Sequence, residues 1–151
     1  MDRADIERWQ VSLQEMKIMK YVLFLVMAFF LGACSKPKSA SDLVGNYEAD
    51  YDVAREKVTL NNDNTFVQEV TLKSTGKVDV AKGTFTYYPR TGYVTFNENY
   101  MIVIDGFRKL NPDYVHPQPG LVSLPADTYF GRIYIGVSEG VLYKKFDSGN
   151  P

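Results

Sequence analysis

Apolar and polar residues alternate with a period of two along most of the chain after residue 43. In the first such stretch, the apolar positions are Tyr47, Ala49, Tyr51 and Val53. The positions between them carry the carboxylates Glu48, Asp50 and Asp52. Side chains of a strand point alternately to its two faces, so this period predicts a strand with one buried and one solvated face. No stretch of useful length has a helical period, and the domain is therefore predicted to be all-β.

Further strands are expected wherever β-branched and aromatic residues recur between Gly or Asn turns. The expected strands cover residues 47–53, a second stretch up to residue 60, then 66–72, 80–85, 93–96, 100–104, 129–137 and 141–146. The inward phase shifts by one residue between Val80 and Phe85, so a bulge is expected at Gly83. A meander of about eight short antiparallel strands can close into a barrel, which removes exposed edges. Such a barrel either encloses one small ligand or is filled by its own side chains.

The stretch from residue 105 to residue 127 differs from the other connections because it contains four prolines. These are Pro112, Pro117, Pro119 and Pro125, and Tyr114 and His116 lie among them. Prolines stiffen a loop and lack the N–H that a central strand needs. The stretch is therefore expected to form a flap across one end of the barrel and to add no central strand. A solvent-exposed insertion is the alternative.

Ahead of the alternating region, residues 21–31 form an uncharged apolar run. Lys17 and Lys20 precede this run, and Gly32 and Ala33 follow it. Positive charge, a short apolar core and small residues, in that order, indicate a secretory signal peptide. A permanent transmembrane helix needs about 20 apolar residues, more than this run provides.

Leu31, Gly32, Ala33 and Cys34 resemble the lipobox of bacterial lipoproteins. The resemblance implies cleavage between Ala33 and Cys34, a diacylglycerol on the Cys34 thiol and an acyl chain on the freed amine. Two or more acyl chains anchor a protein stably to a membrane. A buried core cysteine after a hydrophobic helix is the alternative. Ser35 resembles the pattern of lipoproteins sorted to the outer membrane, so we expect a lipid-anchored protein of the bacterial cell envelope, at the outer membrane.

These features divide the chain into five expected parts. They are a start-site extension (1–15), a lipoprotein signal peptide (16–33), a lipidated tether (34–42), a barrel domain (43–147) and a tail (148–151). The tether combines Ser, Lys and Pro without apolar periodicity, which is typical of a flexible linker.

Four short motifs of the barrel domain point to a family. They are Gly45-Asn46-Tyr47, Leu60 with Asn64-Thr65-Phe66, Gly83-Thr84-Phe85, and Leu142-Tyr143-Lys144-Lys145. Together they resemble the lipocalin-like domains of small bacterial envelope lipoproteins, many of which have no assigned activity. Tyr47 stands where lipocalins have tryptophan. The resemblance implies a lipocalin-like barrel.

Composition and charge narrow the classes of partner. The chain has 151 residues, of which 45% are hydrophobic, and a formal net charge of −1. This is the composition of a globular protein without the basic surface that nucleic acids require. Because Cys34 is the single cysteine, no internal disulfide or cysteine cluster can form. No cofactor is expected beyond the diacylglycerol and N-acyl chain on Cys34.

The candidate ligand-binding residues are Gln68, Tyr114, His116 and Arg132. Gln68 interrupts an apolar strand face, so it either contacts a ligand in a cavity or is a hydrogen-bonded core residue. Arg132 lies between Phe130 and Tyr134, where it either binds an anion or points outward and stacks on aromatic rings. Tyr114 belongs to a tyrosine-rich set that could stack on sugars or peptides, or simply fill the sheet faces.

Catalysis and metal binding find little support. His116 is the only histidine. It could act as a base beside Asp113, but an exposed loop histidine is the favoured interpretation. A single histidine cannot form a zinc site by itself. The three carboxylates of the first strand could attract calcium. Pairing across the hairpin with Arg55 and Lys57 is favoured, because calcium sites also recruit loop carbonyls. We therefore assign no metal and no catalytic residue.

The leading hypothesis is a non-enzymatic, lipid-anchored binding or accessory domain that faces the periplasm or the cell surface. Its partner would be the membrane, through the lipid, together with a small ligand or an envelope protein. A second hypothesis is a protein inhibitor or adaptor that acts through residues 105–127. A third is a hydrolase that uses His116.

Overall fold

The computed structural model describes residues 19–21, 34–105, 109–110, 120–137 and 140–146. The chain divides into two compact units, residues 1–34 and residues 35–151. In the first unit, residues 19–21 are helical. Within the described ranges, no helix is long and apolar enough to cross a bilayer. Most of the predicted signal peptide, including Ala33, and the predicted tail lie outside these ranges.

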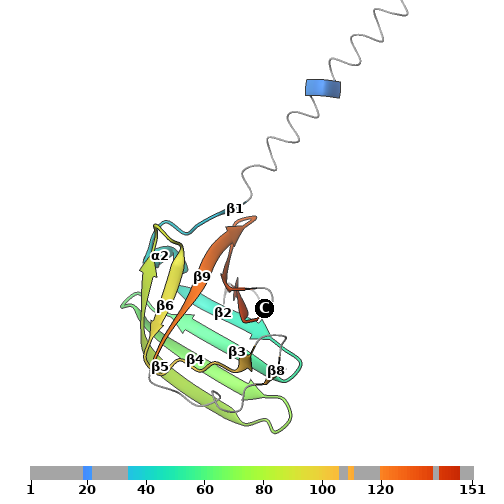
Figure 1. Ribbon diagram of the computed structural model, residues 1–151, viewed down its shortest axis with the longest axis vertical. Helices are drawn as coiled ribbons and strands as arrows, with labels where there is room; N and C mark the ends of the chain where they lie inside the picture. The colour runs from blue at the N-terminus through green and yellow to red at the C-terminus, as the bar shows by residue number, and fades with distance from the viewer. Residues whose placement is uncertain (1–18, 22–33, 106–108, 111–119, 138–139, 147–151) are drawn as a thin grey trace, which may run out of the picture. The chain divides into compact units, whose positions relative to one another are not determined.

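The second unit is an eight-stranded antiparallel β-barrel (Figure 1). The strands, in their order around the barrel, are β2 (Gly45–Asp50), β3 (Ala54–Leu60), β4 (Thr65–Leu72), β5 (Val78–Tyr88), β6 (Tyr93–Asn97), β9 (Leu121–Tyr129), β10 (Arg132–Gly136) and β11 (Leu142–Phe146). Pairing of β11 with β2 closes the barrel. The other short elements are β1 (Cys34–Ser35), α2 (Ala40–Leu43), β7 (Ile104–Asp105) and β8 (Lys109–Leu110). The predicted all-β meander and its closure are confirmed.

The first hairpin shows why these residues form strands. Tyr47 and Ala49 are buried, whereas Asp50 is exposed and Glu48 is half-buried. Arg55, across the hairpin, lies 3.7 Å from Glu48 and 3.2 Å from Asp50. The carboxylates therefore form a solvated, ion-paired face, as favoured from the sequence. Over the part of the chain that the structure describes, no group of three His, Cys, Asp or Glu residues could hold a metal ion.

Residues 100–104 do not form the predicted barrel strand. Residues 100–103 have no strand structure, and Ile104–Asp105 pairs only with β8 in a separate two-stranded sheet. Tyr100, Met101 and Val103 are nevertheless buried in the core. This segment fills the barrel interior. Its residues are apolar because they are buried, and a buried strand has the same apolar composition.

The eighth strand comes from the proline-rich stretch, so the prediction that residues 105–127 add no central strand is wrong. Leu121–Pro125 of β9 pairs with β6, and Ala126–Tyr129 pairs with β10. Pro125 lies where β9 changes partner, opposite the first residue of β6, so its missing N–H interrupts neither ladder. The predicted single strand over residues 129–137 is therefore a hairpin with its turn at Phe130 and Gly131. Residues 111–119, with Tyr114 and His116, lie outside the described ranges.

The bulge predicted at Gly83 is absent from the β4–β5 ladder. The pairing runs without interruption from Thr71 opposite Val78 to Thr65 opposite Thr84. Val80 is 49% exposed, so it points outward and the inward phase never shifts. Gly83 faces inward, where a Cβ atom would lie 2.8 Å from the Phe66 ring. The same Cβ would lie 2.6 Å from the Asn97 carbonyl oxygen, so glycine admits both the ring and this backbone group.

The segment before β2 closes one end of the barrel. The Tyr87 hydroxyl donates to the Pro37 carbonyl at 2.6 Å, and the Lys36 amine donates to the Thr91 carbonyl at 2.9 Å. Leu43 of α2 is fully buried, and the Tyr47 hydroxyl donates to its carbonyl at 2.6 Å. Residues 36–43 of the segment expected to be a tether therefore contact the barrel. We call this end the α2 end; the arrowhead of β9 points toward it (Figure 1).

Candidate functional site

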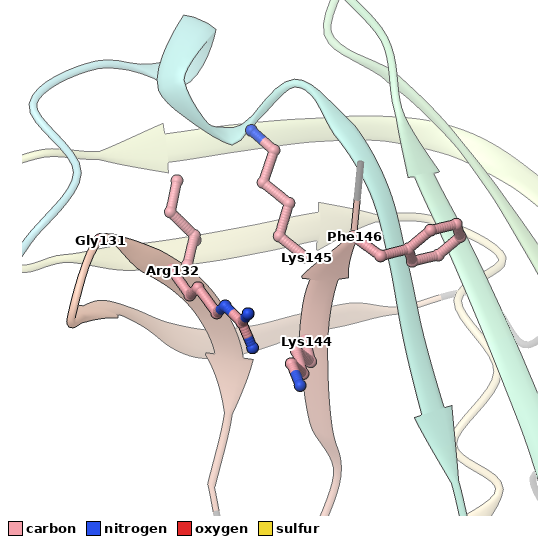
Figure 2. A pocket seen from close by; sticks show the side chains of 6 residues that line it. Gly131, Arg132, Lys144, Lys145 and Phe146 are labelled. Atoms are coloured by element: carbon pink, nitrogen blue, oxygen red, sulfur yellow. The ribbon is translucent and has the colours of Figure 1, made fainter. Parts of the chain in front are cut away.

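The candidate site is a basic pocket of about 480 Å³ on the outer surface, at the α2 end of β10 and β11. Its lining residues are Gly131, Arg132, Ile133, Lys144, Lys145 and Phe146 (Figure 2). None of these six residues is acidic. The lining therefore combines three cations with one aromatic ring.

The β9–β10 turn positions Arg132 at the rim of this pocket. Tyr129 pairs with Arg132, and Phe130 and Gly131 between them have φ angles of 49° and 77°. Two consecutive residues with positive φ are typical of the tight turn that joins twisted antiparallel strands. Arg132 thus becomes the first residue of β10 and points outward.

Strand register brings Lys144 to the same face. Lys144 lies directly opposite Tyr134, which is two residues after Arg132 on β10. Side chains two residues apart share a face of a strand, so Arg132 and Lys144 are diagonal neighbours on the outside of the sheet. Figure 2 shows both cationic groups on the same side of β10 and β11, whereas Lys145 extends toward α2.

The three cationic side chains differ in their contacts within the protein. The Lys145 amine donates to the Asp42 carbonyl at 2.7 Å and lies 5.9 Å from the centre of the Tyr47 ring. Lys145 therefore fastens α2 to β11. Arg132 and Lys144 are both exposed, and neither forms an ion pair with any acidic side chain in the described ranges. They are the two cations available to a ligand.

Two neighbouring cations of this kind can hold an anion. A guanidinium presents a planar fork of N–H donors that matches two oxygens of a carboxylate or phosphate, and an ammonium adds a point charge. The Phe146 ring gives the pocket one apolar wall. The structure thus places Arg132 where the predicted anion-binding role is geometrically possible.

Gln68 lies in a different place, inside the barrel, and is fully buried. Its side-chain amide donates to Glu56 Oε2 and to the Met101 carbonyl, both at 2.9 Å. Its Oε1 accepts from the Met101 N–H at 2.8 Å. Gln68 is therefore a hydrogen-bonded core residue, the second of the two interpretations considered from the sequence.

Glu56 is the residue that the sequence interpretation missed. It is fully buried, accepts a hydrogen bond from the Tyr143 hydroxyl, and its Oε1 has no hydrogen-bond partner among the described residues. Burial raises the pKa of its carboxyl from 4.5 to about 7, against the lowering effect of hydrogen bonds from Tyr143 and Gln68. The alternation of strand residues could have predicted this burial. Arg55 and Lys57 point outward, so Glu56 between them must point inward.

Large side chains fill the interior around this network. Tyr143 and Tyr100 join their hydroxyls at 2.6 Å, and burial raises the pKa of both phenols well above the usual value. The Phe66 ring meets the Phe96 ring edge-on at 5.2 Å. Binding is therefore more readily accommodated on the outer surface than in this filled core.

The basic pocket was only partly foreseeable. Arg132 is a candidate ligand-binding residue from the sequence, whereas Lys144 and Lys145 belong only to the lipocalin-like motif at residues 142–145. Their proximity to Arg132 depends on the pairing of β10 with β11. No protein-family model, no curated protein and no solved structure matches this chain.

Proposed function

We propose that this protein is a non-enzymatic lipoprotein of the bacterial envelope that binds an anionic group in the basic pocket. The proximity of Arg132 and Lys144 on one outer face carries the proposal, because both cations are exposed and neither forms an ion pair in the described ranges. Glu48 lies opposite Lys144 on β2 but is ion-paired with Arg55. The pocket lining suits the binding of an anion without chemical change. An exposed site is also accessible to ligands larger than the interior could hold.

The lipid anchor rests on the lipobox at residues 31–34. In this proposal Cys34 carries the diacylglycerol and N-acyl chain, at the outer membrane. The contacts of Lys36 and Pro37 with the barrel support a short link between lipid and domain. The domain is then lipocalin-like in its eight-stranded meander, with the ligand held outside a filled barrel.

The anion-binding part is tested by titrating the protein with inorganic phosphate and following backbone amide shifts. We expect the largest shifts at Gly131, Arg132 and Lys144. The double variant Arg132→Gln/Lys144→Gln should lose these shifts, because both cations become neutral. The double variant Lys57→Gln/Lys73→Gln removes the same charge elsewhere on the outer surface and should respond as the wild type does. Equal responses of the two double variants would contradict the proposal.

The anchoring part is tested separately by mass spectrometry of protein extracted from bacterial membranes. The expected N-terminal peptide begins at Cys34 and carries acyl chains. An unmodified Cys34 would refute anchoring without affecting the phosphate experiment.

A second candidate is an adaptor that binds a protein through residues 105–127. It is favoured by two exposed apolar side chains that flank the undescribed part of this stretch, Leu110 at 37% and Leu121 at 73% exposure. Replacing Leu121 by Asp should then abolish co-purification of an envelope protein without unfolding the barrel. Unchanged co-purification would count against the adaptor.

A further inference from the structure

Within the described part of the second unit, the exposed aromatic side chains gather at the α2 end. They are Tyr88, Tyr93, Tyr129, Phe130 and Phe146. Phe130, at the tip of the β9–β10 turn, is 82% exposed. Among the described residues, the exposed aliphatic side chains of the barrel strands and of the β10–β11 turn lie at the opposite end: Val78, Val80, Leu121, Val137 and Leu142.

Strand direction explains why the aromatic residues share one end. In an up-and-down antiparallel barrel, every second connection lies at the same end. The β5–β6 and β9–β10 turns are both at the α2 end, as is the end of β11. Tyr88 and Tyr93 face each other across the first of these turns, and Tyr129 and Phe130 belong to the second.

Exposed or half-buried cations lie at the same end. They are Lys36, Arg90, Arg132, Lys144 and Lys145. Acidic residues lie near this end too. Asp42 accepts from the N–H groups of Lys38 and Ser39, and Asp63 accepts from Thr65, so these two carboxylates serve their own turns. Glu48 lies opposite Lys144 and Asp127 lies opposite Tyr134, but neither carboxylate forms an ion pair with Arg132 or Lys144 in the described ranges. Aromatic rings beside basic groups are the combination found at the boundary between lipid and water.

The chain reaches the barrel at this end as well. Lys36 is hydrogen-bonded to Thr91 of the β5–β6 turn, and Pro37 to Tyr87. Cys34 precedes Lys36 by two residues, a span of at most about 7 Å of extended chain. Acyl chains on Cys34 would therefore hold the α2 end, and not the opposite end, against the bilayer.

We propose that the α2 end is a membrane-binding surface, in which Phe130 and the neighbouring tyrosines enter the lipid interface while Arg132 and Lys144 bind the phosphate of an anionic phospholipid. This inference rests on the proposed function, because it requires lipid on Cys34 and names the anion of the basic pocket. Burying the exposed Phe130 ring in the interface is favoured by the hydrophobic effect. A basic group near an anionic leaflet adds electrostatic attraction. The barrel then stands end-on, with the β4–β5 and β10–β11 connections facing away from the membrane.

The test places a single tryptophan at either end of the lipidated mature protein. Trp9 is the only tryptophan of the chain and precedes the cleavage site, so a new tryptophan is the sole indole. Phe130→Trp reports on the α2 end, and Val80→Trp is the control at the opposite end. Each variant is reconstituted on vesicles of phosphatidylglycerol and phosphatidylethanolamine with brominated acyl chains, which quench indole fluorescence on contact. We expect at least several-fold stronger quenching for Phe130→Trp than for Val80→Trp.

The outcomes separate the two proposals. Lipid on Cys34 with equal, weak quenching at both positions would overturn the membrane-binding surface and leave anchoring intact. An unmodified Cys34 would overturn anchoring, and this inference with it. Adding Arg132→Gln/Lys144→Gln to Phe130→Trp should weaken quenching on these anionic vesicles and leave it unchanged on phosphatidylcholine vesicles. Unchanged quenching on both, with phosphate binding lost, would assign the pocket to a free anion and overturn the phospholipid contact.

Discussion

At the scale of single residues, Glu56 and Phe130 are among the positions that depart from the ordinary rules of a folded protein. Glu56 is a carboxyl buried in a core, and Phe130 is a bulky residue in the left-handed region of φ. Each departure has an energetic cost that a substitution can measure.

The buried carboxyl should make the barrel less stable as pH rises. Because the folded state holds the pKa of Glu56 near 7 while the unfolded value is near 4.5, the folded state binds more protons between these values. Stability is therefore fully present below pH 4.5 and is lost as pH rises through 7. We expect the free energy of unfolding to fall by about 2 kcal/mol from pH 5 to pH 8.

Glu56→Gln isolates this effect, because glutamine keeps the shape and a hydrogen-bond acceptor but cannot ionise. Urea unfolding of the variant should show a flatter dependence on pH and higher stability than the wild type at pH 8. Identical pH profiles for the two proteins would show that Glu56 does not titrate in this range.

The strained turn should become more stable when its aromatic residue is replaced. Phe130→Gly relieves a positive φ that disfavours L-residues and should raise the free energy of unfolding by up to about 1 kcal/mol. The matched control is Gly131→Ala, where φ is 77° and a Cβ would meet no atom within 4 Å. That variant should lose about 1 kcal/mol from backbone conformation alone. A loss of stability in Phe130→Gly would mean that the ring is needed for folding.

At the scale of elements, the segment between β6 and β7 behaves as a plug held by side chains. Gln68 of β4 bonds both the N–H and the carbonyl of Met101, as a neighbouring strand would do. Stacking of Tyr100 on Phe96 at 4.5 Å adds an aromatic contact. A segment without a strand partner can therefore remain buried with its backbone satisfied.

Gln68→Leu should release this plug. Leucine fits the apolar surroundings but leaves the Met101 backbone groups buried without a partner, which should cost about 3 kcal/mol of stability. Amide hydrogen exchange at Met101 should accelerate accordingly. Glu69→Leu, on the exposed face of the same strand, should change stability by no more than about 0.5 kcal/mol. Equal effects of the two substitutions would contradict a specific role for the glutamine.

At the scale of the whole molecule, stability depends on the closure of the barrel by its last strand. β11 pairs with both β2 and β10, and its Tyr143 reaches the buried carboxyl of Glu56. Losing β11 would expose two strand edges and remove Tyr143 from the buried polar network. The barrel is therefore expected to fold as one cooperative unit.

Truncation tests this cooperativity. A chain that ends at Val141 should lose its sigmoidal unfolding transition by circular dichroism, because the edges of β2 and β10 remain unpaired. A chain that lacks only the predicted tail, residues 148–151, should unfold as the full chain does. A sigmoidal transition of full amplitude in the shorter chain would show that closure is dispensable.

The amino-acid sequence by itself determined the all-β class, the closed antiparallel meander and most of its strands, because alternation along a strand is a local property. Residues 31–34 resemble a lipobox, and lipid on Cys34 stays a prediction from that resemblance. Only the tertiary structure decided that Pro125 belongs to a strand, that residues 100–104 plug the interior and that Lys144 lies beside Arg132. Each of these features depends on which segments, distant in sequence, lie side by side in the fold. The residues next to a position in the sequence do not specify which distant segment it will contact.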